Sequence, residues 1–196
     1  MKLTKKILCS VAAVIGLVTG SAAVYGPELI KPVGQVVIEE QPLGALRISA
    51  KGLAIIGNAE GCVKTPYLCP GGKATNGIGN THGVPDETIS LEQVAIDWVG
   101  NIQEAERCVT AAERVSGERM TQGQFDAFTS FVFNFGCTKF RKNRDGSDTR
   151  IYHAIKEGDH LKACSHIPEW VKSQGVVLKG LVTRRGKEYE RCMEVD

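Results

Sequence analysis

The sequence predicts an α+β fold in which a small β lobe and a larger, mainly helical lobe face each other across a cleft. Residues 61–83 contain six glycines and two prolines, a composition typical of short strands joined by turns. Two capping boxes, sequence signals for helix starts, follow further along the chain. The 196 residues are 42% hydrophobic and 23% charged, which is the balance of an ordinary globular protein rather than a disordered or fibrous one.

The amino-terminal segment predicts export. The basic residues 2–6 precede 19 uncharged residues, 7–25, about the length that a membrane-spanning helix needs. Eight of these 19 are Ile, Leu or Val, so membrane insertion is only weakly favourable. We expect residues 1–25 to be a retained signal anchor in the inner membrane, with the rest of the chain in the periplasm. A cleaved signal peptide with Ser21-Ala22-Ala23 as the processing site is the alternative.

Residues 26–47 are predicted to be a linker, because three prolines and three glycines prevent a helix there. The run GQVVIEE within it could pair as a short edge strand. The folded domain is expected over residues 48–196. Its first helix has Ser49 as N-cap and ends at Gly61, which puts Glu60 in the last turn. A carboxylate there meets the negative end of the helix dipole, a placement that suits a proton donor better than a structural glutamate.

The remaining elements follow from turn signals and helical spacing. Residues 61–83 should form the β lobe. The capping box at residues 90–93 opens a helix to about Ala112, and the box at residues 121–124 opens another that ends at Gly136. Further helical periodicity occurs at residues 150–165, 166–173 and 180–193.

Three residues at fixed spacing carry the chemistry. Glu60 is followed after eight residues by Cys69, after five more by Thr75, and then by the run GIGNTHG at residues 77–83. This pattern resembles the phage-type lysozymes (endolysins) of glycoside hydrolase family 24, whose signature is a helix-end glutamate, an aspartate nine positions on, a threonine six beyond and a similar glycine-rich hairpin. Later landmarks occur in the expected order over residues 49–192: FDAFTSFVFNFG, IPEWVKSQG and GLVTRRGKEYERC.

The resemblance implies a lysozyme-like fold and a monomeric enzyme without a cofactor. Its implied reaction is hydrolysis of the β-1,4 bond between N-acetylmuramic acid and N-acetylglucosamine in peptidoglycan glycan strands. A glycosidic oxygen is a poor leaving group, so a carboxyl must give it a proton, and Glu60 is the candidate. Thr75 matches the family pattern, whereas Cys69 replaces its aspartate.

Seven cysteines indicate an oxidising compartment, and their odd number leaves at least one thiol. Cys69 can act only when it is reduced. With Cys9 inside the anchor, the chain resembles the signal-anchor-release endolysins, which implies a regulatory set of Cys9, Cys62 and Cys69. The resemblance also implies that the membrane that holds residues 7–25 is the inner membrane of a host cell and that the host export machinery places the chain there. We expect Cys62 and Cys69 to be paired while the enzyme is tethered, and Cys9 to exchange with that bond after release. Alternatively, Cys69 only closes a structural disulfide with Cys62.

The other cysteines are predicted to be structural. Four cysteines allow three connectivities, and pairing between sequence neighbours is one of them. These four are Cys108, Cys137, Cys164 and Cys192.

Several other residue types give weaker signals. The four histidines have no metal-like spacing with the cysteines, so no metal site is expected. Trp98 and Trp170 are interpreted as core or cleft-wall residues, and Arg184 and Arg185 as a solvated face or a structural ion pair. Beyond the amino terminus, 21 basic residues balance 22 acidic ones, which disfavours nucleic-acid binding.

Two alternative functions remain open from sequence. A lytic transglycosylase needs only one catalytic glutamate, because the hydroxyl of the sugar itself attacks. A catalytically dead wall-binding module would explain the exchange of aspartate for Cys69.

Overall fold

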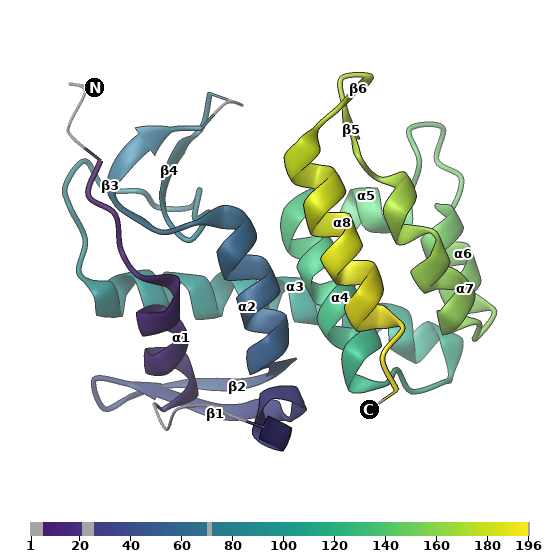
Figure 1. The fold of residues 1–196 in the computed structure, drawn as a ribbon, viewed down its shortest axis with the longest axis horizontal. Coiled ribbons are helices and arrows are strands. Elements are labelled where there is room, and N and C mark those ends of the chain that lie inside the picture. The colour runs from purple at the N-terminus through teal and green to yellow at the C-terminus, as the bar shows by residue number, and fades with distance from the viewer. Residues whose placement is uncertain (1–5, 21–25, 70–71, 196) are drawn as a thin grey trace.

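The computed structural model describes residues 6–20, 26–69 and 72–195. Two groups of elements stand side by side in Figure 1, and the long helix α3 crosses the first group towards the second, with β3 and β4 above it and β1 and β2 below it in this view. The first group consists of α1 (Val11–Thr19), η1 (Gly26–Ile30), β1 (Pro32–Ile38), β2 (Gln41–Ser49), α2 (Ala50–Glu60), β3 (Val63–Leu68) and β4 (Ala74–Gly77).

The second group is mainly helical and follows α3 (Leu91–Ser116) in the chain. It consists of α4 (Gln122–Phe135), α5 (Cys137–Arg141), α6 (Arg150–Lys156), α7 (His160–Ser165), η2 (Ile167–Glu169), β5 (Lys172–Ser173), β6 (Val176–Val177) and α8 (Lys179–Cys192). A lysozyme-like α+β arrangement is therefore present, with small two-stranded sheets rather than one large sheet.

The segment expected as a membrane anchor packs against the protein in this structure. Helix α1 covers only residues 11–19, and its Val14 and Val18 are buried against α2, α3 and β1. Gly57 of α2 makes room for it, because a Cβ at Gly57 would lie 2.4 Å from a methyl group of Val11. In the part of the chain that is described, no helix is both long and apolar enough to cross a membrane. Residues 2–5 of the basic region and residues 21–25 of the expected anchor lie outside the described residues.

The region expected as a linker contains a β-hairpin. Strands β1 and β2 pair antiparallel, with Ile38 opposite Gln41 at the turn and Pro32 opposite Ser49 at the open end. Val36, Ile38, Leu46 and Ile48 are buried, so one face of the hairpin joins the core of the first lobe. The predicted edge strand is part of a larger element, and the linker interpretation of this region is wrong for this structure.

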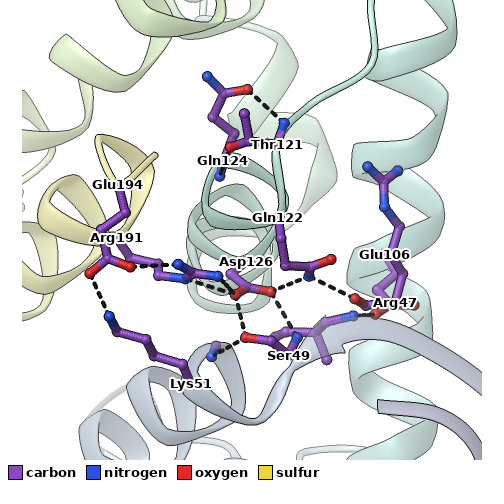
Figure 2. Close-up of polar contacts among 12 residues, drawn as sticks. Arg47, Ser49, Lys51, Glu106, Thr121, Gln122, Gln124, Asp126, Arg191 and Glu194 are labelled. Atoms are coloured by element: carbon purple, nitrogen blue, oxygen red, sulfur yellow. Dashed lines mark hydrogen bonds and ion pairs between the residues drawn. The ribbon is translucent and has the colours of Figure 1, made fainter. Parts of the chain in front are cut away.

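The start of α2 is fixed by a buried polar network (Figure 2). The Ser49 side chain accepts a hydrogen bond from the Gly52 N–H, as an N-cap does. Asp126 of α4 accepts hydrogen bonds from the Ser49 N–H (2.8 Å) and the Ser49 hydroxyl (2.5 Å). Arg191 of α8 is paired with the same carboxylate at 2.8 Å. The N-terminal end of α2 is therefore held by two helices of the other lobe.

The helical lobe has an aromatic core. Phe125, Phe128, Phe131 and Phe140 are each fully buried, and Trp170 lies edge-on against the Phe131 ring at 5.4 Å between centroids. This placement agrees with a core or cleft-wall role for Trp170, and Trp98 of α3 is buried in the first lobe.

Two disulfides close this lobe, Cys108–Cys137 and Cys164–Cys192, and each joins sequence neighbours among the four cysteines. They tie α3 to α5 and α7 to α8.

Most predicted helices are present with small shifts at their ends. Ser90 and Thr121 are the N-caps of α3 and α4, and Thr121 and Gln124 form a complete capping box. The expected helix over residues 166–173 is wrong. A single 3-10 turn, η2, is followed there by the strand β5, because Pro168 fits only the first turn of a helix and the chain then extends into a hairpin.

Candidate active site

Glu60 is the last residue of α2, and its carboxylate faces the glycine-rich loop that follows β4. The next residue, Gly61, has φ +72°, a conformation that a glycine adopts without steric cost. Across the site, Gly79 has φ +70°, and a Cβ there would lie 3.1 Å from Glu60 Oε2. Both glycines therefore let the backbone turn tightly around this carboxylate.

Arg184 of α8 binds the other oxygen of Glu60. Its Nη1 donates to Glu60 Oε1 at 2.5 Å, and the two side chains are 4% and 23% exposed. Arg184 is separated from Glu60 by 124 residues in sequence, so no local signal could reveal the pair. The solvated-face interpretation of Arg184 is wrong, because the side chain is buried and forms an ion pair with the predicted proton donor.

Arg184 is itself held in place from behind. Its Nε donates to Glu188 Oε1 at 3.0 Å, and its Nη2 donates to the Ser130 carbonyl at 3.0 Å. Burial raises the pKa of Glu188 and lowers the pKa of the neighbouring Arg185 to about 10. Arg185, also buried, pairs with Glu188 at 3.0 Å, which makes it a structural partner of this cluster.

Cys69 and Thr75 lie on the β3–β4 hairpin, which follows α2 and its last residue, Glu60, in the chain. The Cys69 N–H donates to the Lys73 carbonyl at 3.0 Å, and the Gly72 N–H donates to the Cys69 carbonyl at 2.8 Å. Thr75 is buried, and its hydroxyl donates to the Lys73 carbonyl at 3.0 Å. The lone pairs of Thr75 Oγ1 are therefore left to accept a hydrogen bond from a ligand or a water.

Tyr67 is a site residue that sequence reasoning missed. It pairs with Thr75 across the two strands and lies two residues before Cys69. Burial raises the pKa of its phenol, and the charges of Glu60 and Cys69 raise it further. The alternation of β3 could have indicated it, because residues 67 and 69 of an extended strand point to the same side.

A pocket lies between the two lobes, and Gly79, which approaches the Glu60 carboxylate, is one of its lining residues. The loop residues Thr81 and His82 also line it, as do Asn101 and Glu104 of α3. The helical lobe contributes Val132, Phe133, Gly136 and Cys137. The same loop that contacts the Glu60 carboxylate therefore forms a wall of the pocket, as a cleft between a β lobe and a helical lobe requires.

All seven cysteines lie within the described residues, and six of them form disulfides. Cys9, just before α1, is bonded to Cys62, two residues after Glu60. Cys69 is in none of the three disulfides. This structure therefore has the Cys9–Cys62 pairing that was expected after release, and it does not contain the Cys62–Cys69 bond expected for the tethered enzyme.

Within the described residues, no group of three or more His, Cys, Asp or Glu side chains could hold a metal ion. The His82 side chain has no assigned role here, whereas its backbone carbonyl accepts from Asn80 Nδ2 at 2.9 Å and shapes the loop.

The fold and the glutamate at the cleft define a lysozyme, a glycoside hydrolase of the muramidase class. The Phage lysozyme family matches residues 57–188, and the chain belongs to this family. The SAR-endolysin of Haemophilus phage HP1 is 38% identical over 194 residues, which cover 95% of each protein.

Two solved structures of the endolysin Lyz from phage P1 are also similar. The crystal structure of its active form superimposes with a TM-score of 0.76 at 36% identity, over 95% of this chain and 94% of Lyz. The secreted inactive form gives a TM-score of 0.54 at 40% identity, over 75% of this chain and 96% of that one. The present structure is thus more like the active form.

Proposed function

We propose that this lysozyme is an endolysin that hydrolyses the β-1,4 bond between N-acetylmuramic acid and N-acetylglucosamine in peptidoglycan. The observation that carries the proposal is the position of Glu60. Its Oε1 is bound by Arg184, while its Oε2 lies on the side of Gly79, whose loop lines the pocket. A glycan strand bound along this loop would meet one oxygen of a carboxyl whose other oxygen is fixed by Arg184.

In the proposed reaction, protonated Glu60 transfers its proton from Oε2 to the glycosidic oxygen as the bond to the sugar C1 breaks. A water adds to C1 through its oxygen, loses one proton to solvent and keeps the other as the new hydroxyl. Glu60 is then reprotonated from solvent. Thr75 orients this water in the proposed reaction, which is supported by its hydrogen bond to the Lys73 carbonyl, because the hydroxyl hydrogen is used there and the oxygen can accept from the water. Cys69, on the same hairpin, takes the place of a second carboxylate and acts in its reduced form.

A lytic transglycosylase is the second candidate, and Cys69 in place of an aspartate is the observation that favours it. The two reactions differ by one molecule of water. Mass spectrometry of products from purified peptidoglycan should find reducing muramic ends. Anhydro-muramic ends would replace the hydrolase proposal with the transglycosylase, and intact glycan would favour the dead wall-binding module.

The proposal includes control at the host inner membrane. Before release, residues 7–25 lie in the bilayer, the catalytic domain is in the periplasm, and Cys62 is bonded to Cys69. A thiolate in hydrocarbon is heavily disfavoured, so Cys9 cannot attack there. After release, the Cys9 thiolate attacks the Cys62 sulfur, Cys69 leaves as a thiolate, and the number of disulfides is unchanged.

Three features support this control. Cys9 is bonded to Cys62 in the described structure, Cys69 is outside the disulfides, and α1 is packed into the first lobe. The greater likeness to the active form of the P1 relative agrees with a released state. The HP1 relative that spans nearly the whole chain is a SAR-endolysin.

Two cysteine variants test the control in cells. Cys9→Ser should be exported normally but remain inactive after release, because no thiol can open the Cys62–Cys69 bond. Cys62→Ser should be active while still tethered and should lyse cells early. If Cys9→Ser lyses cells on the normal schedule, the exchange step is wrong, although the muramidase proposal would stand.

A further inference from the structure

The chain that precedes α1 lies alongside β3, next to the active site. The Lys64 N–H donates to the Ile7 carbonyl at 2.7 Å, and the Cys9 N–H donates to the Cys62 carbonyl at 3.0 Å. The Ile7 N–H donates to the Thr65 hydroxyl at 3.1 Å, and Leu8 forms an antiparallel bridge with Val63. Residues 7–9 are therefore hydrogen-bonded to the catalytic hairpin, and the Cys9–Cys62 disulfide fixes their register.

This register brings a cation to Tyr67. Lys6 is directly before the bonded residues, and its Nζ lies 4.3 Å from the centre of the Tyr67 ring. An ammonium at this distance over an aromatic face is attracted by the negative face of the ring. The backbone bonds of Ile7 limit how far Lys6 can move away, so the contact holds the ring from the amino-terminal side.

Tyr67 is related to each of the three predicted catalytic residues, by strand pairing, by sequence or by charge. It is the cross-strand partner of Thr75, and it is two residues from Cys69 on the same hairpin. Burial raises the pKa of its phenol, and the Glu60 charge raises that pKa further, so the ring lies within the electrostatic reach of Glu60. A change in the ring position would therefore alter the geometry of the hairpin that faces Glu60.

We infer that Lys6 is a positioning residue for the lysozyme reaction, which holds Tyr67 in place beside Glu60, Cys69 and Thr75. The amino-terminal segment is then a working part of the active site in the released enzyme, in addition to any role as an anchor. Lys6, which would lie on the cytoplasmic side while the chain is tethered, would then contact Tyr67 once the chain is released. This inference rests on the proposed hydrolase chemistry but not on the disulfide exchange.

The first test compares Lys6→Met with Lys6→Arg in the purified, full-length, released enzyme. Lys6→Met should lower kcat on purified peptidoglycan by about twofold to fivefold, as expected for a cation–π contact at an exposed site, with KM unchanged. Lys6→Arg keeps a cation over the ring and should restore kcat. Lys31→Met is the matched control, because Lys31 is an exposed lysine that contacts Glu28 outside the active site.

The second test is a double-mutant cycle with Tyr67. Lys6→Met should have no further effect on kcat in a Tyr67→Leu background, because the ring it acts on is gone. A Tyr67→Phe background keeps the ring and removes only the hydroxyl, so Lys6→Met should still lower kcat there by the same factor. Tyr67→Ile is a second variant without the ring if Tyr67→Leu does not fold, and Lys6→Met should have no further effect in it. Equal kcat for Lys6→Met and Lys31→Met, or a loss that persists in Tyr67→Leu, would overturn the inference. An inactive wild-type enzyme would instead refute the proposed function.

Discussion

The two ends of helix α2 are held by the same helix, α8, but in different ways. At the N-terminal end, Asp126 and Arg191 are 0% and 1% exposed, and their network includes the Ser49 N-cap (Figure 2). At the C-terminal end, Arg184 is buried, but its partner Glu60 is 23% exposed and lies against Gly79, one of the residues that line the pocket. An Arg–carboxylate pair closed on all sides serves the fold, whereas one that leaves a carboxylate oxygen accessible can serve chemistry.

The largest expected effect is on turnover, from a substitution at the C-terminal end of α2. Glu60→Gln keeps the size of the side chain but removes the proton donor, so turnover should fall by about a hundredfold to ten-thousandfold. Turbidity loss of outer-membrane-permeabilised cells measures this rate. Glu190→Gln, an exposed glutamate on α8, is the control and should remain active. A Glu60→Gln enzyme with the wild-type rate would show that Glu60 is not the proton donor.

The next largest effect is on stability, from a substitution at the N-terminal end of α2. Asp126→Ala would leave the Arg191 charge buried without this partner and the Ser49 N–H without its acceptor. We expect a loss of about 3–5 kcal/mol in the free energy of unfolding, measured by urea denaturation. Asp126→Asn, which keeps an acceptor oxygen, should lose less. Glu60→Gln should stay within about 1 kcal/mol of wild type, and equal losses at both ends would contradict the comparison.

A smaller effect concerns pH. Glu106 of α3 accepts the Ile48 N–H at 2.6 Å just before the N-cap, and burial raises its pKa. Because the folded protein holds this proton more tightly than the unfolded chain, Glu106 adds stability at low pH that is lost as pH rises through the folded pKa. The stability of wild type relative to Glu106→Gln should therefore increase as pH falls through the folded pKa towards the ordinary glutamate value. Unfolding curves across this range measure the difference, and a difference that does not change with pH would contradict the assignment.

The smallest effect is expected at the rim of the same network. Lys51 and Glu194 form an ion pair whose side chains are 42% and 36% exposed. Such exposed pairs contribute about 0–1 kcal/mol, so Lys51→Met should barely change the unfolding midpoint or the activity. A loss as large as that of Asp126→Ala would mean that the network depends on its exposed members.

Local signals predicted α2 and the starts of α3 and α4 well, because each begins with a side chain that caps its own helix. The β1–β2 hairpin was missed for a local reason as well. Its turn residues are Glu39 and Glu40, both with positive φ (49° and 63°), where turn rules expect Gly, Asn or Asp. The prolines of this region exclude a helix but not a strand, because Pro32 is the first residue of β1, a position that tolerates proline.

The candidate site also contains residues that a local pattern predicts and residues that only the tertiary structure brings together. Glu60, Cys69 and Thr75 could be found because they share one short stretch with a recognisable spacing. Arg184 and Lys6 come from distant parts of the chain, and only the packing of α8 and of the amino-terminal segment brings them to Glu60 and Tyr67. Contacts between such distant residues leave no periodic pattern in one sequence.

The most direct test of the central claim is a disulfide map by non-reducing mass spectrometry, made separately on membrane-bound and soluble protein and paired with muramidase activity. The account predicts an inactive membrane-bound form with Cys62 bonded to Cys69, and an active soluble form with Cys9 bonded to Cys62, as in this structure. An active soluble enzyme in which Cys62 and Cys69 are still bonded would contradict it.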